Sequence, residues 1–306
     1  MSAAAMPLGT SRTVYPSPIK RRRATKAQMR DRHQALLNIV KAGRPMTVRQ
    51  VFYAATVRGL IEKTERGYQK VAESLTALRR SGAMPYEWLA DSTRWMRKPT
   101  TYGSLDDALK RTVETYRKDL WADSDAYVEI WLEKDALAGV VYPVTEEYDV
   151  PLMVARGYSS LSFLASAARA MEQRGQHCYV YHLGDHDPSG VNAGENIEHR
   201  LRELAPSASI IFERVAVTQA QIAEWKLPSR PTKTSDPRSG KWRGGDSVEL
   251  DALSTERLQG LVRGCIEQHL PAYELARLKK IEEAERETLE RITGLATRAI
   301  RMRGAS

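Results

Sequence analysis

The stretch that decides the fold runs Tyr179-Val-Tyr-His-Leu-Gly-Asp185-His-Asp187-Pro-Ser189-Gly190. Its first half is aromatic and β-branched, and together with the preceding residues it predicts a buried β-strand over His177–Leu183. Two carboxylates one residue apart follow this strand. Asp187 and Pro188 suit the N-cap and the first turn of a helix. The sequence therefore predicts a strand, an acidic turn and a helix in direct succession.

A third acidic side chain closes another predicted strand upstream, in the run Ala126-Tyr-Val-Glu-Ile-Trp-Leu-Glu133. If the two strands are parallel neighbours, Glu133, Asp185 and Asp187 meet at their carboxyl ends, where open α/β sheets place their sites. Three carboxylates on one rim repel one another unless a divalent cation neutralises them. Hard oxygen ligands of this kind suit Mg²⁺ or Mn²⁺. An Asp-x-Asp turn alone is often only a helix cap, but the added Glu133 favours a metal site for phosphodiester chemistry.

Strands and helices alternate through the region that contains these acids. This alternation predicts a parallel, Rossmann-like sheet with helices on both faces, an α/β domain over residues 126–253. The expected strands are Ala126–Glu133, Pro151–Arg156, His177–Leu183 and Ala208–Val217. The helices expected between and after them are Asp135–Tyr148, Ser160–Gln173 and Pro188–Leu204.

The region before this domain has a helical pattern over residues 30–100. Helices are expected at Asp31–Lys41, at Val48–Arg58 behind the N-cap Thr47, and at Thr64–Arg80, followed by an extended wing at Met84–Ala90. Three helices with a β-wing are typical of an α+β winged-helix DNA-binding domain, although a plain helical bundle fits the pattern equally well. Basic side chains expected to contact phosphates are Arg79, Arg80, Arg94, Arg97 and Lys98.

The net charge of +9 and a pI near 9.5 indicate a polyanionic partner such as DNA, RNA or an anionic membrane surface. Residues 1–29 are expected to be a basic disordered tail, which is either a nucleic-acid arm or only a solubilising tail. The remaining regions are expected to be a helical connector at 101–125, a basic loop at 226–246 and charged helices at 254–306. Candidate DNA-binding residues in the tail and the loop are Lys20, Arg21, Arg22, Arg23, Lys241 and Arg243.

The sequence gives no support for a membrane-spanning, a secreted or a zinc-binding protein. No apolar run approaches the roughly 20 residues that span a bilayer, and no hydrophobic signal core stands near the N-terminus. We therefore expect a cytoplasmic protein. Cys178 and Cys265 are the two cysteines of the chain, too few for a structural zinc site, and Cys178 lies in an apolar strand as a buried thiol.

The spacing of Glu133 and Asp185-x-Asp187 resembles the Toprim domain shared by topoisomerases, bacterial-type primases and several nucleases. The run Asp-x-Asp-Pro-x-Gly is close to the version in the topoisomerase VI A subunit and its relatives, which include the meiotic double-strand-break transesterases. The domain order is similar too, because a winged helix precedes the Toprim domain in that family. The resemblance covers roughly Met46 to Leu253.

In that family the winged helix bears a catalytic tyrosine in an Arg-acid-x-aromatic-Tyr motif. The corresponding run here is Arg49-Gln50-Val51-Phe52-Tyr53, in which Gln50 replaces the acid. The resemblance implies that Tyr53 attacks phosphorus to give a 5′-phosphotyrosyl link while Arg49 stabilises the phosphate. Arg49 and Tyr53 stand on one helix face, but aromatic pairs such as Phe52 and Tyr53 are more often packing residues.

The resemblance also implies how the whole assembly works. Glu133, Asp185 and Asp187 would hold one or two Mg²⁺ ions, and Glu249 would support them. The protein would act as a homodimer on double-stranded DNA and cut both strands. Because the sequence contains no Walker loop, any ATP-driven step would need a separate ATPase subunit of the B type.

Two other functions remain open on the sequence. A hydrolytic nuclease of the same fold would need the three acids but not Tyr53, since an activated water would attack. A DNA-binding protein without catalysis would tolerate the loss of all three acids and keep its salt-dependent affinity.

Overall fold

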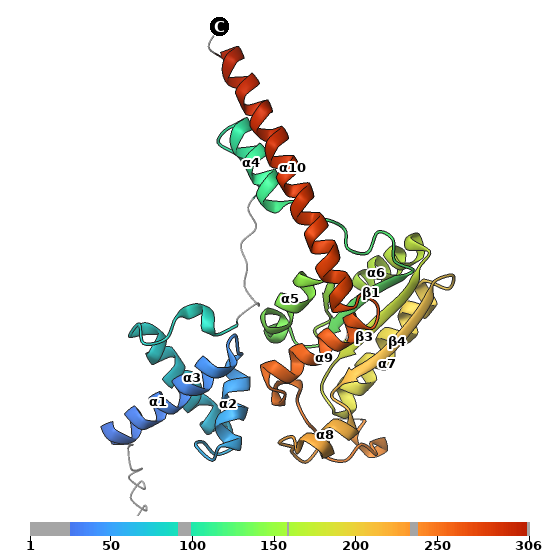
Figure 1. Cartoon of the computed structure of the whole chain (residues 1–306). Helices are drawn as coiled ribbons and strands as arrows, with labels where there is room; N and C mark the ends of the chain where they lie inside the picture. Colours follow the sequence, from blue (N-terminus) through green and yellow to red (C-terminus); the bar gives the residue numbers. More distant parts are fainter. Residues whose placement is uncertain (1–24, 91–98, 158, 233–237, 305–306) are drawn as a thin grey trace, which may run out of the picture.

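The computed structural model describes residues 25–90, 99–157, 159–232 and 238–304 of the chain (Figure 1). An N-terminal helical unit is followed by an α/β unit, and a two-helix arm extends from the α/β unit. The basic residues Lys20, Arg21, Arg22 and Arg23, and likewise Arg94, Arg97 and Lys98, lie outside the described residues. The same holds for the side chain of Lys241.

The α/β unit is built on a four-stranded sheet in the order β2-β1-β3-β4, in which every neighbouring pair is parallel. This confirms the predicted α/β class and the all-parallel sheet. The two central strands are mostly apolar because helices cover both of their faces, and the polar residues Glu129 and His182 within them are buried too. The strands are β1 Ala126–Leu132, β2 Leu152–Val154, β3 His177–Leu183 and β4 Ser209–Ala216.

Each face of the sheet has its own apolar core. Ile130 and Leu183 point to one face and pack with helices α5 and α9, whereas Trp131 and Val180 point to the other and pack with α6 and α7. Helix α9, which the sequence pattern grouped with the C-terminal segment, thus belongs to the core of the α/β unit. The helices are α5 Ala138–Glu147, α6 Leu161–Arg174, α7 Pro188–Leu204, α8 Gln219–Trp225 and α9 Thr255–Glu267.

The N-terminal unit packs three helices around Leu36, Val51 and Leu75, all of which are fully buried. Each helix begins at a threonine whose hydroxyl accepts a backbone N–H, and Thr47 does so for α2 as expected. The helices are α1 Lys26–Gly43, α2 Val48–Val57 and α3 Glu65–Arg80.

The prediction of an extended wing at Met84–Ala90 is wrong for its central residues. Residues Tyr86–Trp88 form a 3₁₀ turn, η1, and in the described part of this segment only Leu89 makes a strand-like bridge, to Met46. Pro85 has no N–H to offer a neighbouring strand, and the tight turn lets Met84 and Leu89 both bury their side chains. A winged-helix topology therefore remains a proposal.

The arm consists of helix α4, Leu105–Thr115, lying along the long helix α10, Ala272–Gly304 (Figure 1). Thr297 Oγ1 donates to Asp106 at 2.6 Å and Tyr116 Oη donates to Glu285 at 2.7 Å, which holds the two helices together. The predicted connector helix is shorter than expected. Within the described chain, no helix combines the length and apolarity needed to cross a bilayer. Three further 3₁₀ turns are η2 Asp135–Leu137, η3 Ser239–Lys241 and η4 Leu250–Ala252.

Candidate active site

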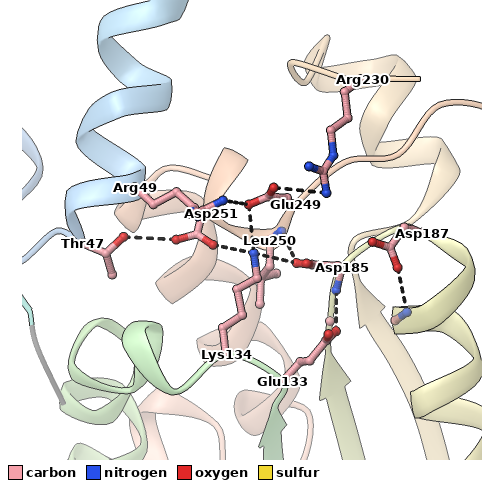
Figure 2. A network of polar contacts seen from close by, with 12 residues as sticks. Thr47, Arg49, Glu133, Lys134, Asp185, Asp187, Arg230, Glu249, Leu250 and Asp251 are labelled. Carbon is pink, nitrogen blue, oxygen red and sulfur yellow. Dashed lines mark hydrogen bonds and ion pairs between the residues drawn. The ribbon is translucent and has the colours of Figure 1, made fainter. Parts of the chain in front are cut away.

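The acidic residues meet at the carboxyl rim of the sheet, where the sequence places them. Leu132 and Leu183 are in register on neighbouring strands, so Glu133 and Asp185 emerge side by side. The Asp185 N–H donates to Glu133 Oε2 at 2.8 Å (Figure 2). Asp187 stands at the start of α7, where its Oδ1 accepts the Gly190 N–H at 2.8 Å as a helix cap.

Two glycines let the Glu133 carboxylate lie against the acidic turn. A Cβ at Gly184 would stand 2.6 Å from Glu133 Oε2, and a Cβ at Gly190 would stand 2.5 Å from the Asp185 carbonyl oxygen. Contacts this short require an atom to move: at Gly190 it is the backbone of the turn, and at Gly184 it is the carboxylate of Glu133 and the ring of His182. The glycines of the Leu-Gly-Asp-His-Asp-Pro-Ser-Gly run are therefore required by close packing around the carboxylates.

The rim carries negative charge in a desolvated setting. Burial, and then the neighbouring Asp185, raise the pKa of Glu133 to about 7. Burial raises the pKa of Asp185 as well. The carboxylates on this rim are the hard oxygen donors that Mg²⁺ and Mn²⁺ prefer, and a cation would relieve the repulsion that disfavours their charged forms. The donor set therefore fits a divalent metal ion.

The carboxylates are not gathered into a finished coordination shell. Over the described residues, no three His, Cys, Asp or Glu side chains form a group that could hold a metal ion. The reason is visible in their contacts: Glu133 accepts a backbone N–H, Asp187 caps a helix, and Asp185 pairs with Lys134 at 3.1 Å. Loading with a metal would require these side chains to exchange partners.

A second acidic pair, Glu249 and Asp251, faces the first from the loop before α9. Lys134 lies between the two sets, 2.7 Å from Asp251 and 3.2 Å from Glu249. The Leu250 N–H donates to Asp185 Oδ1 at 2.8 Å and ties the loop to the acidic turn. Burial would raise the pKa of Glu249, but Lys134 and Arg49 outweigh it and lower the value to about 2. Except for Glu249, sequence reasoning missed these residues.

Arg214, on β4, stabilises the acidic turn through hydrogen bonds to its backbone. Its Nη2 donates to the carbonyl oxygens of Gly184 at 3.0 Å and Asp185 at 2.5 Å, and its Nη1 donates to Gly190 at 3.3 Å. One guanidinium thus fixes three backbone carbonyls around the carboxylates. The sequence gives little signal for this role, because Arg214 follows Glu213 in a partly exposed strand.

Helix α2, which carries the run Arg49–Tyr53, contacts the second acidic pair through Arg49 and through its N-cap Thr47. Arg49 Nη1 lies 2.7 Å from Glu249 Oε2, and Thr47 Oγ1 donates to Asp251 at 3.2 Å. Gln50, at the position of the family's acidic residue, donates to the Leu253 carbonyl at 3.3 Å and completes the capping box of α2. The N-terminal unit is therefore joined to the rim by its helix α2.

Tyr53 lies close to the site but is enclosed. Its side chain is 5% exposed, with the Phe52 ring 5.5 Å and the Lys63 ammonium 5.4 Å from its ring. Burial, and then the charge of Glu249, raise the pKa of Tyr53 to about 12. The phenol is therefore protonated at neutral pH in this arrangement of the two units.

A cleft of about 710 Å³ lies beside the contact of α2 with the second acidic pair and is lined by residues of α2, α3 and the rim. Its walls carry both acids and bases, among them Arg49, Arg79, Lys134, Arg156, Glu133 and Asp185.

Of the other DNA-binding candidates, Arg80 is exposed near the end of α3, and Arg243 is exposed on the loop before Asp246. His186 points away from the carboxylates: its ring packs on Trp242 and forms a hydrogen bond of 2.9 Å with the Gly244 carbonyl.

We compared the chain with known protein families and with curated proteins, and neither comparison gave a significant match.

Proposed function

We propose that the protein cleaves double-stranded DNA with the help of Mg²⁺ or Mn²⁺, as a relative of the topoisomerase VI A subunit with a winged helix and a Toprim domain. The observation that carries this proposal is the pairing of Glu133 and Asp185 at the ends of two adjacent parallel strands, beside the helix cap Asp187. A cleft lined by arginines leads to these acids. Cations there would bind the phosphates of the DNA backbone.

In this proposal each side chain has a defined task. Glu133, Asp185 and Asp187 would hold the cation, which would supply positive charge beside the oxygens of the scissile phosphate. Arg49 would leave Glu249 and bind a non-bridging phosphate oxygen. The Tyr53 oxygen would then form a bond to phosphorus as the bond to the 3′ oxygen breaks. The phenol loses its proton and the freed 3′ oxygen gains one. One phosphodiester bond would thus replace another, and the step would be reversible.

The burial of Tyr53 makes one condition of this mechanism explicit. A phenol with a pKa of about 12, enclosed beside Glu249, is a poor nucleophile. The N-terminal unit would have to shift relative to the rim so that Tyr53 leaves the acidic pair and approaches a phosphate. The Arg49–Glu249 ion pair, with Arg49 45% exposed, is a contact that such a shift has to break.

The same burial supports hydrolysis as a second candidate function. In a hydrolytic nuclease an activated water attacks, and Tyr53 is only a packing residue of α2, beside Phe52 of the same helix and Lys63. Both candidates need the acidic rim. They differ in whether the protein becomes linked to the DNA end.

The deciding experiment incubates the protein with end-labelled duplex DNA and Mg²⁺ or Mn²⁺, and stops the reaction with detergent before and after protease treatment. A protease-sensitive adduct that disappears in Tyr53→Phe, but persists in Tyr68→Phe, establishes the transesterase. Tyr68 is a matched control because it belongs to the same helical unit and lines the cleft. Free cut ends in Tyr53→Phe establish the hydrolase.

The acidic rim is tested separately with Asp185→Asn and Asp187→Asn. Both variants should lose cleavage and keep their affinity for duplex DNA. Unchanged cleavage would exclude a Toprim-type site. Absence of cleavage in every sample would leave two interpretations, a missing partner subunit or a DNA-binding protein without catalysis. A homodimer and a separate ATPase subunit of the B type remain part of the proposal. Light scattering of the purified protein, with and without duplex DNA, tests the dimer.

A further inference from the structure

Lys134 is the central cation of the acidic rim. Its ammonium lies within 3.2 Å of three carboxylates, those of Asp251, Asp185 and Glu249 (Figure 2). The side chain is 21% exposed, so water screens these contacts far less than it screens surface ion pairs. The residue follows Glu133 directly, which brings it to the rim on the same strand end.

Each carboxylate around Lys134 has a second, fixed partner on another part of the chain. Asp185 accepts the Leu250 N–H, and Asp251 accepts the Thr47 hydroxyl. Glu249 pairs with Arg49 at 2.7 Å and with Arg230 at 3.3 Å. The three acids are therefore held around the ammonium from separate directions, and the arrangement places one positive charge where the negative charges converge.

Resting on the proposed metal-dependent function, we propose that Lys134 is a positioning residue that acts as a built-in competitor of the divalent cation. Its ammonium lies 3.1 Å from Asp185 Oδ1, and Asp185 is also a proposed ligand of the cation. A dication and an ammonium that share one carboxylate repel each other strongly in a partly buried site. Lys134 thereby lowers the cation affinity of the rim and keeps Asp185 in position while it does so.

Removal of the positive charge should consequently strengthen cation binding. In Lys134→Met and Lys134→Gln, the carboxylates of Asp185, Glu249 and Asp251 lose their shared counter-ion. All three carboxylates then attract a divalent cation more strongly, and the ammonium no longer repels it. We expect the affinity for Mn²⁺ to rise by at least about tenfold, as charges a few ångströms apart in a partly buried site require.

The test measures free Mn²⁺ by electron paramagnetic resonance in titrations without DNA, so that binding is read independently of cleavage. The samples are the wild type, the two neutral variants, Lys134→Arg and Lys118→Met. Lys118 is the matched control, because it forms an ion pair of 3.0 Å with Glu285 on the arm, away from the rim. Lys134→Arg and Lys118→Met should bind Mn²⁺ no more tightly than the wild type.

Equal or weaker Mn²⁺ binding by the neutral variants would overturn the inference. If those variants are unstable, added Mn²⁺ should raise their melting temperature more than that of the wild type, and failure of millimolar Mn²⁺ to do so also overturns it. Asp185→Asn separates this result from the proposed function. If Asp185→Asn leaves Mn²⁺ binding unchanged, the metal site itself is wrong; if it abolishes binding while Lys134→Met matches the wild type, only the role of Lys134 is wrong.

Discussion

Gly190→Ala is the substitution that most directly tests how tightly the acidic turn is packed. The added Cβ would stand 2.5 Å from the Asp185 carbonyl oxygen and 3.1 Å from Glu133 Oε2. The carbonyl cannot yield easily, because Arg214 Nη2 donates to it at 2.5 Å. The turn between β3 and α7 would have to move by roughly half an ångström to reach a tolerable contact.

The expected loss of stability is a balance of two effects. Overpacking of a well-packed site costs about 1–3 kcal/mol. Gly190 lies in the first turn of α7, where alanine is favoured over glycine by up to about 1 kcal/mol. With the full helix gain, the balance is a loss of about 0–2 kcal/mol in the free energy of unfolding, and we expect a net loss for Gly190→Ala. Because the movement displaces Asp185, Mn²⁺ affinity should fall as well.

Urea denaturation followed by tryptophan fluorescence measures the first effect, and Mn²⁺ titration measures the second. Gly260→Ala is the control, since it lies inside α9 and a Cβ there meets nothing within 4 Å. It should stabilise the protein by up to about 1 kcal/mol. If Gly190→Ala matched Gly260→Ala in stability and bound Mn²⁺ like the wild type, the close packing of the acidic turn would be refuted.

Three further predictions concern charge at the same rim. The pKa of Glu133 is raised from 4.5 to about 7, so between these pH values the folded state holds a proton that the unfolded state releases. Without metal, in the presence of a chelator, the wild type should therefore lose up to about 3 kcal/mol of stability as the pH rises from 4.5 to 7. Glu133→Gln should show no such loss in urea denaturation repeated across this pH range. Arg49→Ala leaves Glu249 paired with Lys134 and Arg230, so it should cost at most about 1 kcal/mol in urea denaturation while cleavage falls by about a hundredfold or more. Burial and Arg214 lower the pKa of His182 to about 3, so its ring should show no protonation in an NMR titration from pH 8 down to pH 5.

The parts of the site that follow strand ends could be predicted from the sequence. Two apolar runs of strand length, each closed by an acid, place Glu133 and Asp185 together once the strands are parallel neighbours. Asp187 and Thr47 were expected as helix caps, and the structure confirms both. These features depend on local patterns and on the geometry shared by all parallel sheets, so a single sequence contains them.

The partners of the acids could not be predicted, because they come from distant parts of the chain. Lys134 meets Asp251, 117 residues further on, and Arg49 meets Glu249, 200 residues further on. No periodicity relates such positions, and a charged residue in a loop is usually solvated. The prediction of a wing was wrong for a different reason. The run has a strand-like composition, but it contains Pro85, and burial of the Met84 and Leu89 side chains favours a turn.

The contact between Arg49 and Glu249 connects two elements of the proposed mechanism, the tyrosine and the arrangement of the two units. Glu249 contributes to the raised pKa of Tyr53 and also binds Arg49, so the same carboxylate restrains both residues of the family motif. A shift that frees Arg49 for a phosphate would also remove a negative charge from the neighbourhood of the phenol. Nucleophile activation and phosphate binding would then be one conformational event, set by the strength of a single half-exposed ion pair. If Tyr53 instead has only a packing role, Glu249→Gln should change stability without changing the chemistry of cleavage. The effect of Glu249→Gln on adduct formation therefore separates the two roles of Tyr53 without altering the tyrosine itself.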